Sequence, residues 1–153
     1  MRIAVLGAGS WGSGLALGLS ENKKTSITIL HHNAYYDTHF HFKYFSDIPI
    51  PKEINITSNK NDIIDADIFF IVQPTKVINE TLDWINKYST SNSPIIVNCS
   101  KGFDYKSKMT FYQLVTKKFP KFKDSYCILS GPSHAEEVVN KLPTAVVVAS
   151  NNI

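Results

Sequence analysis

The sequence lacks the features that mark membrane, secreted or nucleic-acid-binding proteins. No apolar run approaches the roughly eighteen residues that a membrane-spanning helix needs. The N-terminal residues show no h-region and no small-residue cleavage site, so we expect no signal peptide. The formal net charge is only +3, from 16 basic and 13 acidic residues. This balance suits an anionic small molecule but is too weak to indicate nucleic-acid binding.

Cysteine is scarce, and the histidines show no metal-ligand spacing. Cys99 and Cys127 each lie in or beside an apolar run, far apart in the chain. We expect two buried thiols in a reducing compartment, the cytoplasm, rather than a disulfide or a metal pair. Histidines gather between residues 31 and 41, but without regular spacing or a nearby cysteine, so we expect no zinc site.

The 153 residues are enough for one domain, and 43% of them are hydrophobic. Short apolar runs alternate with segments of helical period, which predicts strands buried on both faces of a parallel sheet. We therefore predict a Rossmann-type, doubly wound α/β fold with a mostly parallel sheet and helices on both faces. The expected strands are 3–6, 27–30, 54–57, 67–74, 95–100, 126–133 and 144–150, and the expected helices are 10–20, 76–88, 107–119 and 134–142.

Two segments stand outside this pattern. Residues 33–47 have no clear period, and we expect a surface loop with a small helix there. After the last expected strand no helix follows to cover the edge of the sheet. Because a doubly wound domain normally packs something onto that edge, we expect a further domain after residue 153.

The segment GAGSWG, residues 7–12, fits the pattern G-x-G-x-x-G between a strand and a helix. Gly7 would allow the tight turn, and Gly9 would let the backbone approach a pyrophosphate at the helix N-terminus. Gly12 would let the helix pack close to the strand. The motif in this context predicts dinucleotide binding. The alternative is a glycine turn used only for packing.

The end of the second expected strand bears on the choice of cofactor. An acidic residue there would hold the ribose 2′-hydroxyl of NAD. This chain has His31, His32 and Asn33 instead, so no carboxylate would repel a 2′-phosphate. A histidine can donate a hydrogen bond to either group. NADP is favoured by this reasoning, and NAD stays open.

Three motifs together resemble a known family. GAGSWG, then SKG at 100–102, then GPSHAEEV at 131–138 resemble the N-terminal domain of bacterial-type NAD(P)-dependent glycerol-3-phosphate dehydrogenase. The likeness runs from Arg2 to about Ser150 and includes the segment IPIPKEINITSN. That family reversibly reduces dihydroxyacetone phosphate to sn-glycerol 3-phosphate with NADH or NADPH, for glycerophospholipid synthesis.

The resemblance implies a set of site residues. The implied cofactor contacts are Gly7, Gly9, Ser10, Trp11, Gly12, His31, His32, Tyr44, Pro74, Lys101 and Ala135. The implied substrate contacts are Lys101, Gly131 and Ser133. Independently of the resemblance, Pro74, Lys101 and Ser133 fall at expected strand ends, where parallel sheets bind ligands. The plainer alternatives are that Trp11 packs against the protein, Lys101 is a solvated loop lysine, and Ser133 is an ordinary helix cap.

The chain departs from the family in two places. His134 stands where the family has an aromatic residue, and histidine follows the second strand where the family often has arginine. The resemblance also places the general acid/base lysine in a helical C-terminal domain outside this chain. We therefore expect no catalytic residue here and dinucleotide binding without efficient catalysis. A homodimer is one assembly open to the full-length protein, and the sequence does not fix the oligomeric state.

Two other functions are compatible with the glycine loop. One is another two-domain dehydrogenase, of the 3-hydroxyacyl-CoA or 6-phosphogluconate type, which would not be expected to carry the GPSHAEEV motif after SKG. The other is a non-enzymatic dinucleotide-sensing module, because a fold alone does not fix a function.

Overall fold

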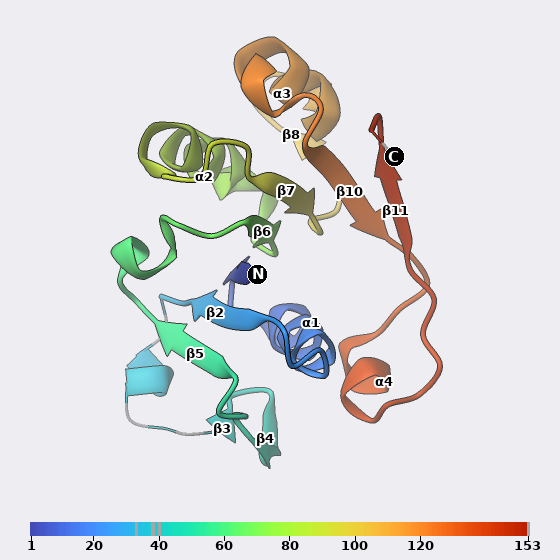
Figure 1. The fold of residues 1–153 in the computed structure, drawn as a ribbon. Coiled ribbons are helices and arrows are strands. Elements are labelled where there is room, and N and C mark those ends of the chain that lie inside the picture. The colour runs from blue at the N-terminus through green and yellow to red at the C-terminus, as the bar shows by residue number, and fades with distance from the viewer. Residues whose placement is uncertain (33, 38, 40, 153) are drawn as a thin grey trace.

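A central β-sheet carries helices on both faces in the computed structural model, which describes residues 1–32, 34–37, 39 and 41–152 (Figure 1). Six strands run parallel: β1 (Arg2–Leu6), β2 (Ser26–Leu30), β5 (Ile54–Thr57), β6 (Ile68–Ile71), β7 (Ile95–Asn98) and β10 (Tyr126–Ser130). An antiparallel strand, β11 (Val147–Ser150), extends the sheet beside β10. The order across the sheet is β5-β2-β1-β6-β7-β10-β11. The order reverses at β1, so the Rossmann-type fold predicted from the sequence is confirmed.

The central strand β1 shows why the apolar runs are continuous. Its residue Ile3 pairs with Ile27 of β2 on one side and with Ile68 of β6 on the other. Ile3 and Val5 contribute to the core on one face of the sheet, while Ala4 and Leu6 contribute to the core on the other face. Alternate residues of a strand point to opposite faces, so a strand covered on both sides has no polar face.

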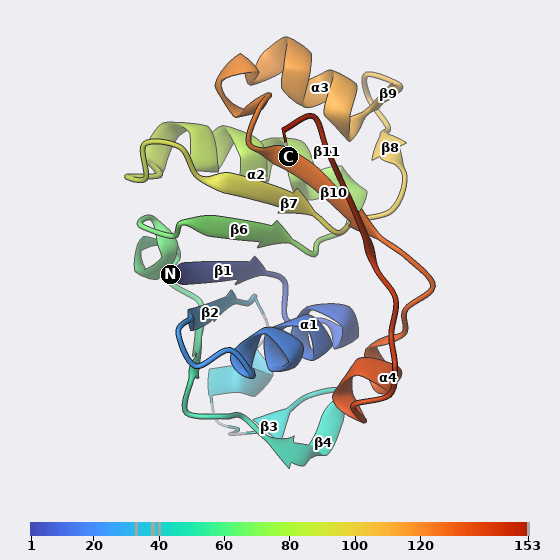
Figure 2. The same cartoon turned by 45° about the vertical axis from the view of Figure 1, so that its right-hand side comes forward.

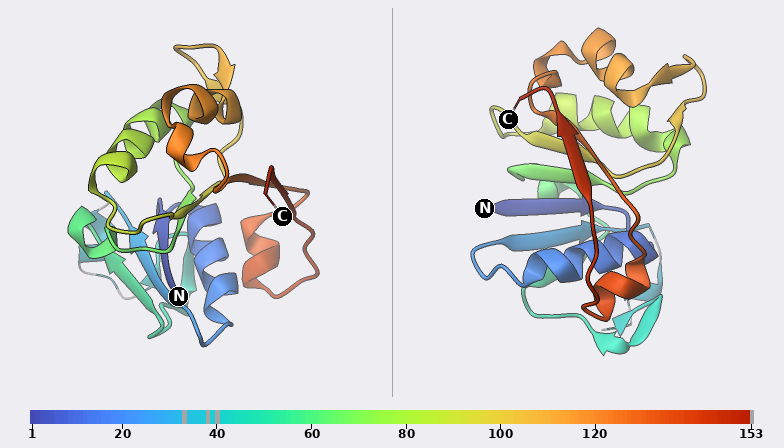
Figure 3. Two further views of the ribbon diagram at one scale, coloured as in Figure 1. Left: turned by 45° about the horizontal axis from the view of Figure 1, so that its top comes forward. Right: turned by 90° about the vertical axis from the view of Figure 1, so that its right-hand side faces the viewer.

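Within the described part of the chain, four α-helices cover the two faces (Figures 2 and 3). The helix α1 (Ser10–Ser20) covers one face, with α4 (Ala135–Val139) packed against it. The helices α2 (Thr75–Tyr88) and α3 (Phe111–Lys118) cover the opposite face through Ile78, Leu82 and Leu114. This arrangement leaves the carboxyl ends of the parallel strands as one continuous edge.

The contact between α1 and α4 depends on small residues. A Cβ atom built on Gly14 would lie 3.2 Å from the carbonyl oxygen of Ala135, and one built on Gly18 would lie 3.4 Å from Cγ1 of Val138. Glycine at position 14 therefore lets the α1 backbone approach the α4 backbone closely, whereas at position 18 an added Cβ atom would only reach ordinary contact with a side chain. As a result, α4 and the loop before it are held beside the start of α1.

Two predicted helices are shorter than expected. The helix expected over 107–119 begins at Phe111, because Thr110 forms a capping box with Gln113: the Gln113 amide donates to Thr110 Oγ1 at 3.2 Å, and the Thr110 amide donates to Gln113 Oε1 at 2.9 Å. The helix expected over 134–142 spans only Ala135–Val139, and it is followed by Lys141 in the left-handed region at φ 56°.

The connections contain two hairpins that the sequence did not predict. One joins β3 (His41–Phe42) to β4 (Phe45–Pro49), and the other joins β8 (Phe103–Asp104) to β9 (Met109–Thr110). The first falls in the segment 33–47, which was expected to be a surface loop, and it buries the Phe42 side chain completely. The small helix expected in that segment is present as a 3-10 helix. The 3-10 helices are Ala34–Asp37, Lys60–Ile63 and Pro120–Phe122.

The outermost strand of the sheet is poorly covered. Val146, Val147 and Val148 at β11 are 47%, 66% and 57% exposed. In contrast, the strands β1 and β6 are almost fully enclosed. Among the described residues, no helix has the length and apolar character needed to cross a membrane.

Candidate functional site

The glycine loop joins β1 to α1 at the carboxyl edge of the sheet. Gly7 has φ of 125°, and a Cβ atom there would collide with the carbonyl oxygen of Val72. A Cβ atom on Gly12 would collide with the carbonyl oxygen of Gly7, so α1 packs against the loop and β1 as the sequence predicts. Both positions therefore require glycine for reasons internal to the fold.

Gly9 differs from its neighbours because the space beside it is open. A Cβ atom built there would meet no protein atom within 4 Å. Gly9 is the N-cap of α1, and its carbonyl accepts the amide of Ser13 at 2.9 Å. No side chain caps this helix end, and its first turn holds no acidic residue. The amides of Ser10, Trp11 and Gly12 are thus available to an anion at the positive end of the helix dipole.

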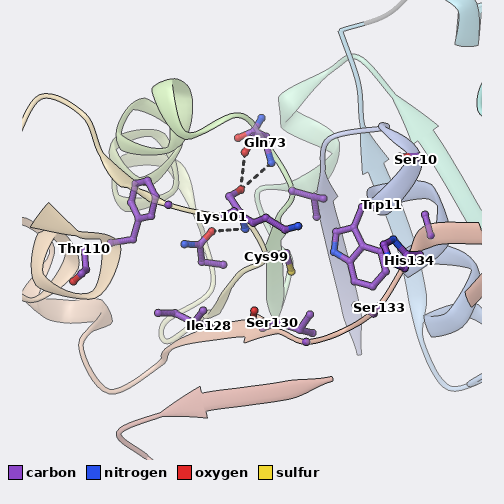
Figure 4. Close-up of a pocket in the computed structure, with 18 of the residues that line it drawn as sticks. Ser10, Trp11, Gln73, Cys99, Lys101, Thr110, Ile128, Ser130, Ser133 and His134 are labelled. Carbon is purple, nitrogen blue, oxygen red and sulfur yellow. Dashed lines mark hydrogen bonds between the residues drawn. The ribbon is translucent and has the colours of Figure 1, made fainter. Parts of the chain in front are cut away.

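A cavity of about 790 Å³ opens beside this helix end. Its walls come from α1, from the ends of β6, β7 and β10, and from the loop before α4. It brings together six of the residues that the resemblance implied: Ser10, Trp11, Lys101, Gly131, Ser133 and Ala135. Figure 4 shows Trp11 beside His134, with the Lys101 side chain extending towards the indole ring.

Lys101 stands on a loop that hydrogen bonds fix in place. The Ser100 hydroxyl donates to the carbonyl of Gln73 at 2.6 Å, and the amide of Gln73 donates to that hydroxyl at 3.2 Å. The amide of Ser100 donates to Oδ1 of the buried Asn98 at 3.0 Å. These bonds tie the end of β7 to the end of β6. Within the described chain, no acidic side chain pairs with the exposed Lys101 ammonium, so its charge is free to meet a ligand.

Two further groups shape this cavity. Gly131 has φ of 153°, and a Cβ atom on it would lie 2.6 Å from the carbonyl oxygen of Ala145, so the returning chain passes close behind it. Cys99 also lines the cavity, and burial raises the pKa of its thiol to about 12. That thiol is therefore protonated and a poor nucleophile at neutral pH. Cys99 and Cys127 are both free, as the sequence predicts, but only Cys127 is fully buried, whereas Cys99 is partly exposed at the cavity.

The helix start near Ser133 differs from the expectation. The N-cap of α4 is His134, not Ser133, and the His134 amide donates to Glu137 Oε2 at 3.2 Å. The Ser133 amide instead donates to the carbonyl of Gly131 at 2.9 Å. Ser133 therefore lines the cavity from the loop and does not cap the helix.

A second cavity, of about 160 Å³, lies at the ends of β1 and β2 beside α2. Gln73 lines both cavities, and its Oε1 accepts the Thr81 hydroxyl at 2.7 Å. Both cavities thus reach Gln73, just after the end of β6. The nine lining residues of the smaller cavity are Leu6, Leu30, His32, Lys60, Gln73, Val77, Glu80, Thr81 and Trp84.

The two histidines after β2 have different surroundings. His32 is exposed and lines the smaller cavity. His31 is 5% exposed, and its ring lies edge-on to Tyr36 at a centroid distance of 5.3 Å. The Tyr36 hydroxyl donates to the carbonyl of Ala8 at 3.3 Å, which connects this pair to the glycine loop. Asn33, considered with them in the sequence, lies outside the described residues.

Two other predicted residues line neither cavity. Tyr44 lies between β3 and β4 at the tip of their hairpin and is 54% exposed. Pro74 follows β6 and forms the N-cap of α2, next to Gln73. Conversely, Gln73, Asn98, Lys60 and Trp84 line the cavities but were missed. A polar residue at the end of an apolar run was the available signal for Gln73 and Asn98, whereas nothing local marks Lys60 or Trp84.

Comparison with known proteins gives a consistent result. The family model described as "NAD-dependent glycerol-3-phosphate dehydrogenase N-terminus" matches residues 2–153. Glycerol-3-phosphate dehydrogenase [NAD(P)+] of Bacillus pumilus is 35% identical over 158 residues, covering 99% of this chain and 46% of the relative. The enzyme of the same name from Orientia tsutsugamushi is 32% identical over 154 residues, covering 98% and 46%.

A solved structure agrees with these relatives. The crystal structure of glycerol-3-phosphate dehydrogenase from Coxiella burnetii superposes with a TM-score of 0.83 at 26% identity, covering 99% of this chain and 47% of that one. The chain thus spans about half the length of the proteins it matches.

Proposed function

This chain belongs to the NAD-dependent glycerol-3-phosphate dehydrogenase family as its N-terminal domain, and from that premise we propose that it binds NAD or NADP along the carboxyl edge of its sheet. The two cavities at the carboxyl edge of the sheet, which share Gln73, are the observation that carries this proposal. Residues 1–153 are then the dinucleotide-binding domain, and the helical catalytic domain lies outside them. The family match does not favour the other dehydrogenase types.

The start of α1 fits the diphosphate of such a cofactor. The open space beside Gly9 and the uncapped amides of Ser10, Trp11 and Gly12 provide hydrogen-bond donors for an anion. Gly7 and Gly12 keep the loop tight beneath that space. The pair of His31 and Tyr36 supports the loop from the side through Ala8.

The larger cavity fits the nicotinamide half of the cofactor together with a substrate. A bound nicotinamide ring would donate or accept the hydride. Trp11 and Ala135 provide apolar surface against which the nicotinamide ring can pack. A nicotinamide ring packed there would be shielded from water. The adenosine half then falls in the smaller cavity, beside His32.

Lys101 is the group in this cavity best suited to an anionic substrate. We place dihydroxyacetone phosphate and sn-glycerol 3-phosphate against it, with Gly131 and Ser133 on the opposite wall. A fixed ammonium stabilises negative charge that develops on a carbonyl oxygen during reduction. The proton is supplied by a lysine of the catalytic domain, so this chain alone binds ligand but catalyses poorly. For the full-length enzyme we propose a location in the cytoplasm and a homodimeric assembly.

The test uses the two tryptophans of the chain, Trp11 and Trp84. Trp84→Phe leaves only Trp11, and we expect NADH or NADPH to quench its fluorescence in a saturable way. Trp11→Phe leaves only Trp84, beside the smaller cavity. The quenching of Trp11 by the nicotinamide ring should then disappear. Calorimetry on the unmodified 153-residue chain provides the control. If it detects no binding of either dinucleotide, the proposal is wrong.

A further inference from the structure

The smaller cavity combines an apolar interior with a polar rim. Leu6, Leu30, Val77 and Trp84 provide surface for a flat base, whereas His32 and Lys60 provide groups that can donate hydrogen bonds. Under the proposed function this cavity receives adenosine. His32 and Lys60 come from neighbouring strands, since β2 pairs with β5 in parallel and each residue follows the end of its strand.

The turn that carries Lys60 is held by its own side chains. The Thr57 hydroxyl donates to Asp62 Oδ2 at 2.6 Å, and Asn59 Nδ2 donates to Asp62 Oδ1 at 3.1 Å. Asn59 Oδ1 in turn accepts the amide of Asn61 at 3.1 Å. These bonds fix the backbone on both sides of Lys60. The position of the Lys60 Cα atom is therefore set before any ligand binds.

The Lys60 ammonium is available to a ligand. It lies 5.5 Å from the centroid of the Trp84 ring, at the cavity wall. The carboxylate of Asp62 is engaged by Thr57 and Asn59, and in the described structure Lys60 forms no ion pair with it. Glu80 is the one carboxylate among the residues that line this cavity, and it too forms no ion pair with Lys60 within the described chain. The rim therefore carries an ammonium that no neighbouring carboxylate holds.

We propose that Lys60 is a specificity-determining residue that binds the 2′-phosphate of NADP, with His32 as a second donor, so that this chain prefers NADP over NAD. The proposal rests on the proposed function, because it requires adenosine in this cavity. A phosphate ester accepts strong, charge-assisted hydrogen bonds from an ammonium, and the chain offers no acidic residue to bind the 2′-hydroxyl of NAD at the end of β2. Lys60 thus replaces the arginine that often accommodates this phosphate.

The test compares two isomers of equal charge, 2′,5′-ADP and 3′,5′-ADP, by calorimetry on the 153-residue chain. We expect the 2′-isomer to bind roughly three- to tenfold more tightly at low salt, with a smaller ratio as salt is added. Lys60→Met should remove most of this preference. Lys123→Met, which removes an exposed lysine at the other side of the fold, should leave it unchanged.

The outcomes separate this inference from the proposed function. If the unmodified chain binds NADH and NADPH but does not distinguish the two isomers, the inference is wrong and the proposed function stands. If Lys60→Met keeps the preference while His32→Leu loses it, Lys60 is not the determinant. If neither dinucleotide binds at all, the proposed function fails and this inference fails with it.

Discussion

The close contact between α1 and α4 leads to a prediction with two matched substitutions. Gly14 and Gly18 lie on α1 four residues apart, and both face α4. Replacing either glycine by alanine adds one methyl group to the same helix, at the buried Gly14 or at the exposed Gly18. What differs is what each methyl group meets, so the pair isolates the effect of the α1–α4 contact.

The expected magnitudes follow from the distances. Alanine in a helix interior is favoured over glycine by about 1 kcal/mol. At Gly18 the new Cβ atom meets only Val138 Cγ1, at the ordinary contact distance of 3.4 Å, so Gly18→Ala should stabilise the domain by about 1 kcal/mol. At Gly14 the new atom meets the carbonyl oxygen of Ala135 at 3.2 Å and its Cα and Cβ atoms at 3.4 Å. Overpacking costs about 1–3 kcal/mol, so Gly14→Ala should be neutral or destabilising by up to about 2 kcal/mol.

Thermal and urea unfolding measure both variants. Gly18→Ala should raise Tm by about 2–4 °C, while Gly14→Ala should leave Tm unchanged or lower it. Because Ala135 also lines the larger cavity, Gly14→Ala should weaken dinucleotide binding and Gly18→Ala should not. Equal stabilisation by the two substitutions would refute the reasoning, since it would mean that α4 does not lie against Gly14 in solution.

Two more predictions concern ionisation. The amide of Arg2 donates to the Asp67 carboxylate at 2.7 Å and lowers the pKa of that carboxyl below 3.8. This contribution to stability is present above pH 3.8 and is lost as the pH falls through the lowered pKa. Asp67→Asn should therefore make acid unfolding less steep, and an unchanged profile would contradict this. The raised pKa of Cys99, about 12, predicts slow alkylation by iodoacetamide at pH 8 in the native chain and fast alkylation in urea. Equally fast alkylation in both states would show that the surroundings of Cys99 do not raise the pKa of its thiol.

The parts of the site that are built from residues close together in the sequence could be predicted from it. The glycine loop and the full extent of α1 follow from a buried strand, a glycine turn and a helical segment in succession. The start of α3 could also have been found, because Thr110 and Gln113 have the spacing of a capping box. The longer helix over 107–119 was predicted from the helical spacing of its apolar residues, but the cap at Thr110 sets the actual start of the helix.

The smaller cavity could not be predicted in the same way. Lys60 reaches it only because β5 lies at the edge beside β2 and the chain then crosses the sheet to β6. Trp84 stands three turns along α2 from Gln73, and its place at the cavity depends on how that helix packs. Likewise, the β3–β4 hairpin has strands too short to show an alternating pattern, and it is fixed by the burial of Phe42. These features arise from tertiary packing.

The exposed valines of β11 bear on how this domain behaves in concentrated solution. Among the described residues, no strand pairs with the outer edge of β11, so its backbone amides and carbonyls offer a template for another chain. Val147 and Val148 add apolar surface on both sides of that edge. An open strand of this kind promotes aggregation by edge-to-edge pairing, and natural proteins suppress such pairing with an inward-facing lysine or a proline. The segment TAVVVAS has neither, so the solubility of the isolated domain depends on what covers this edge.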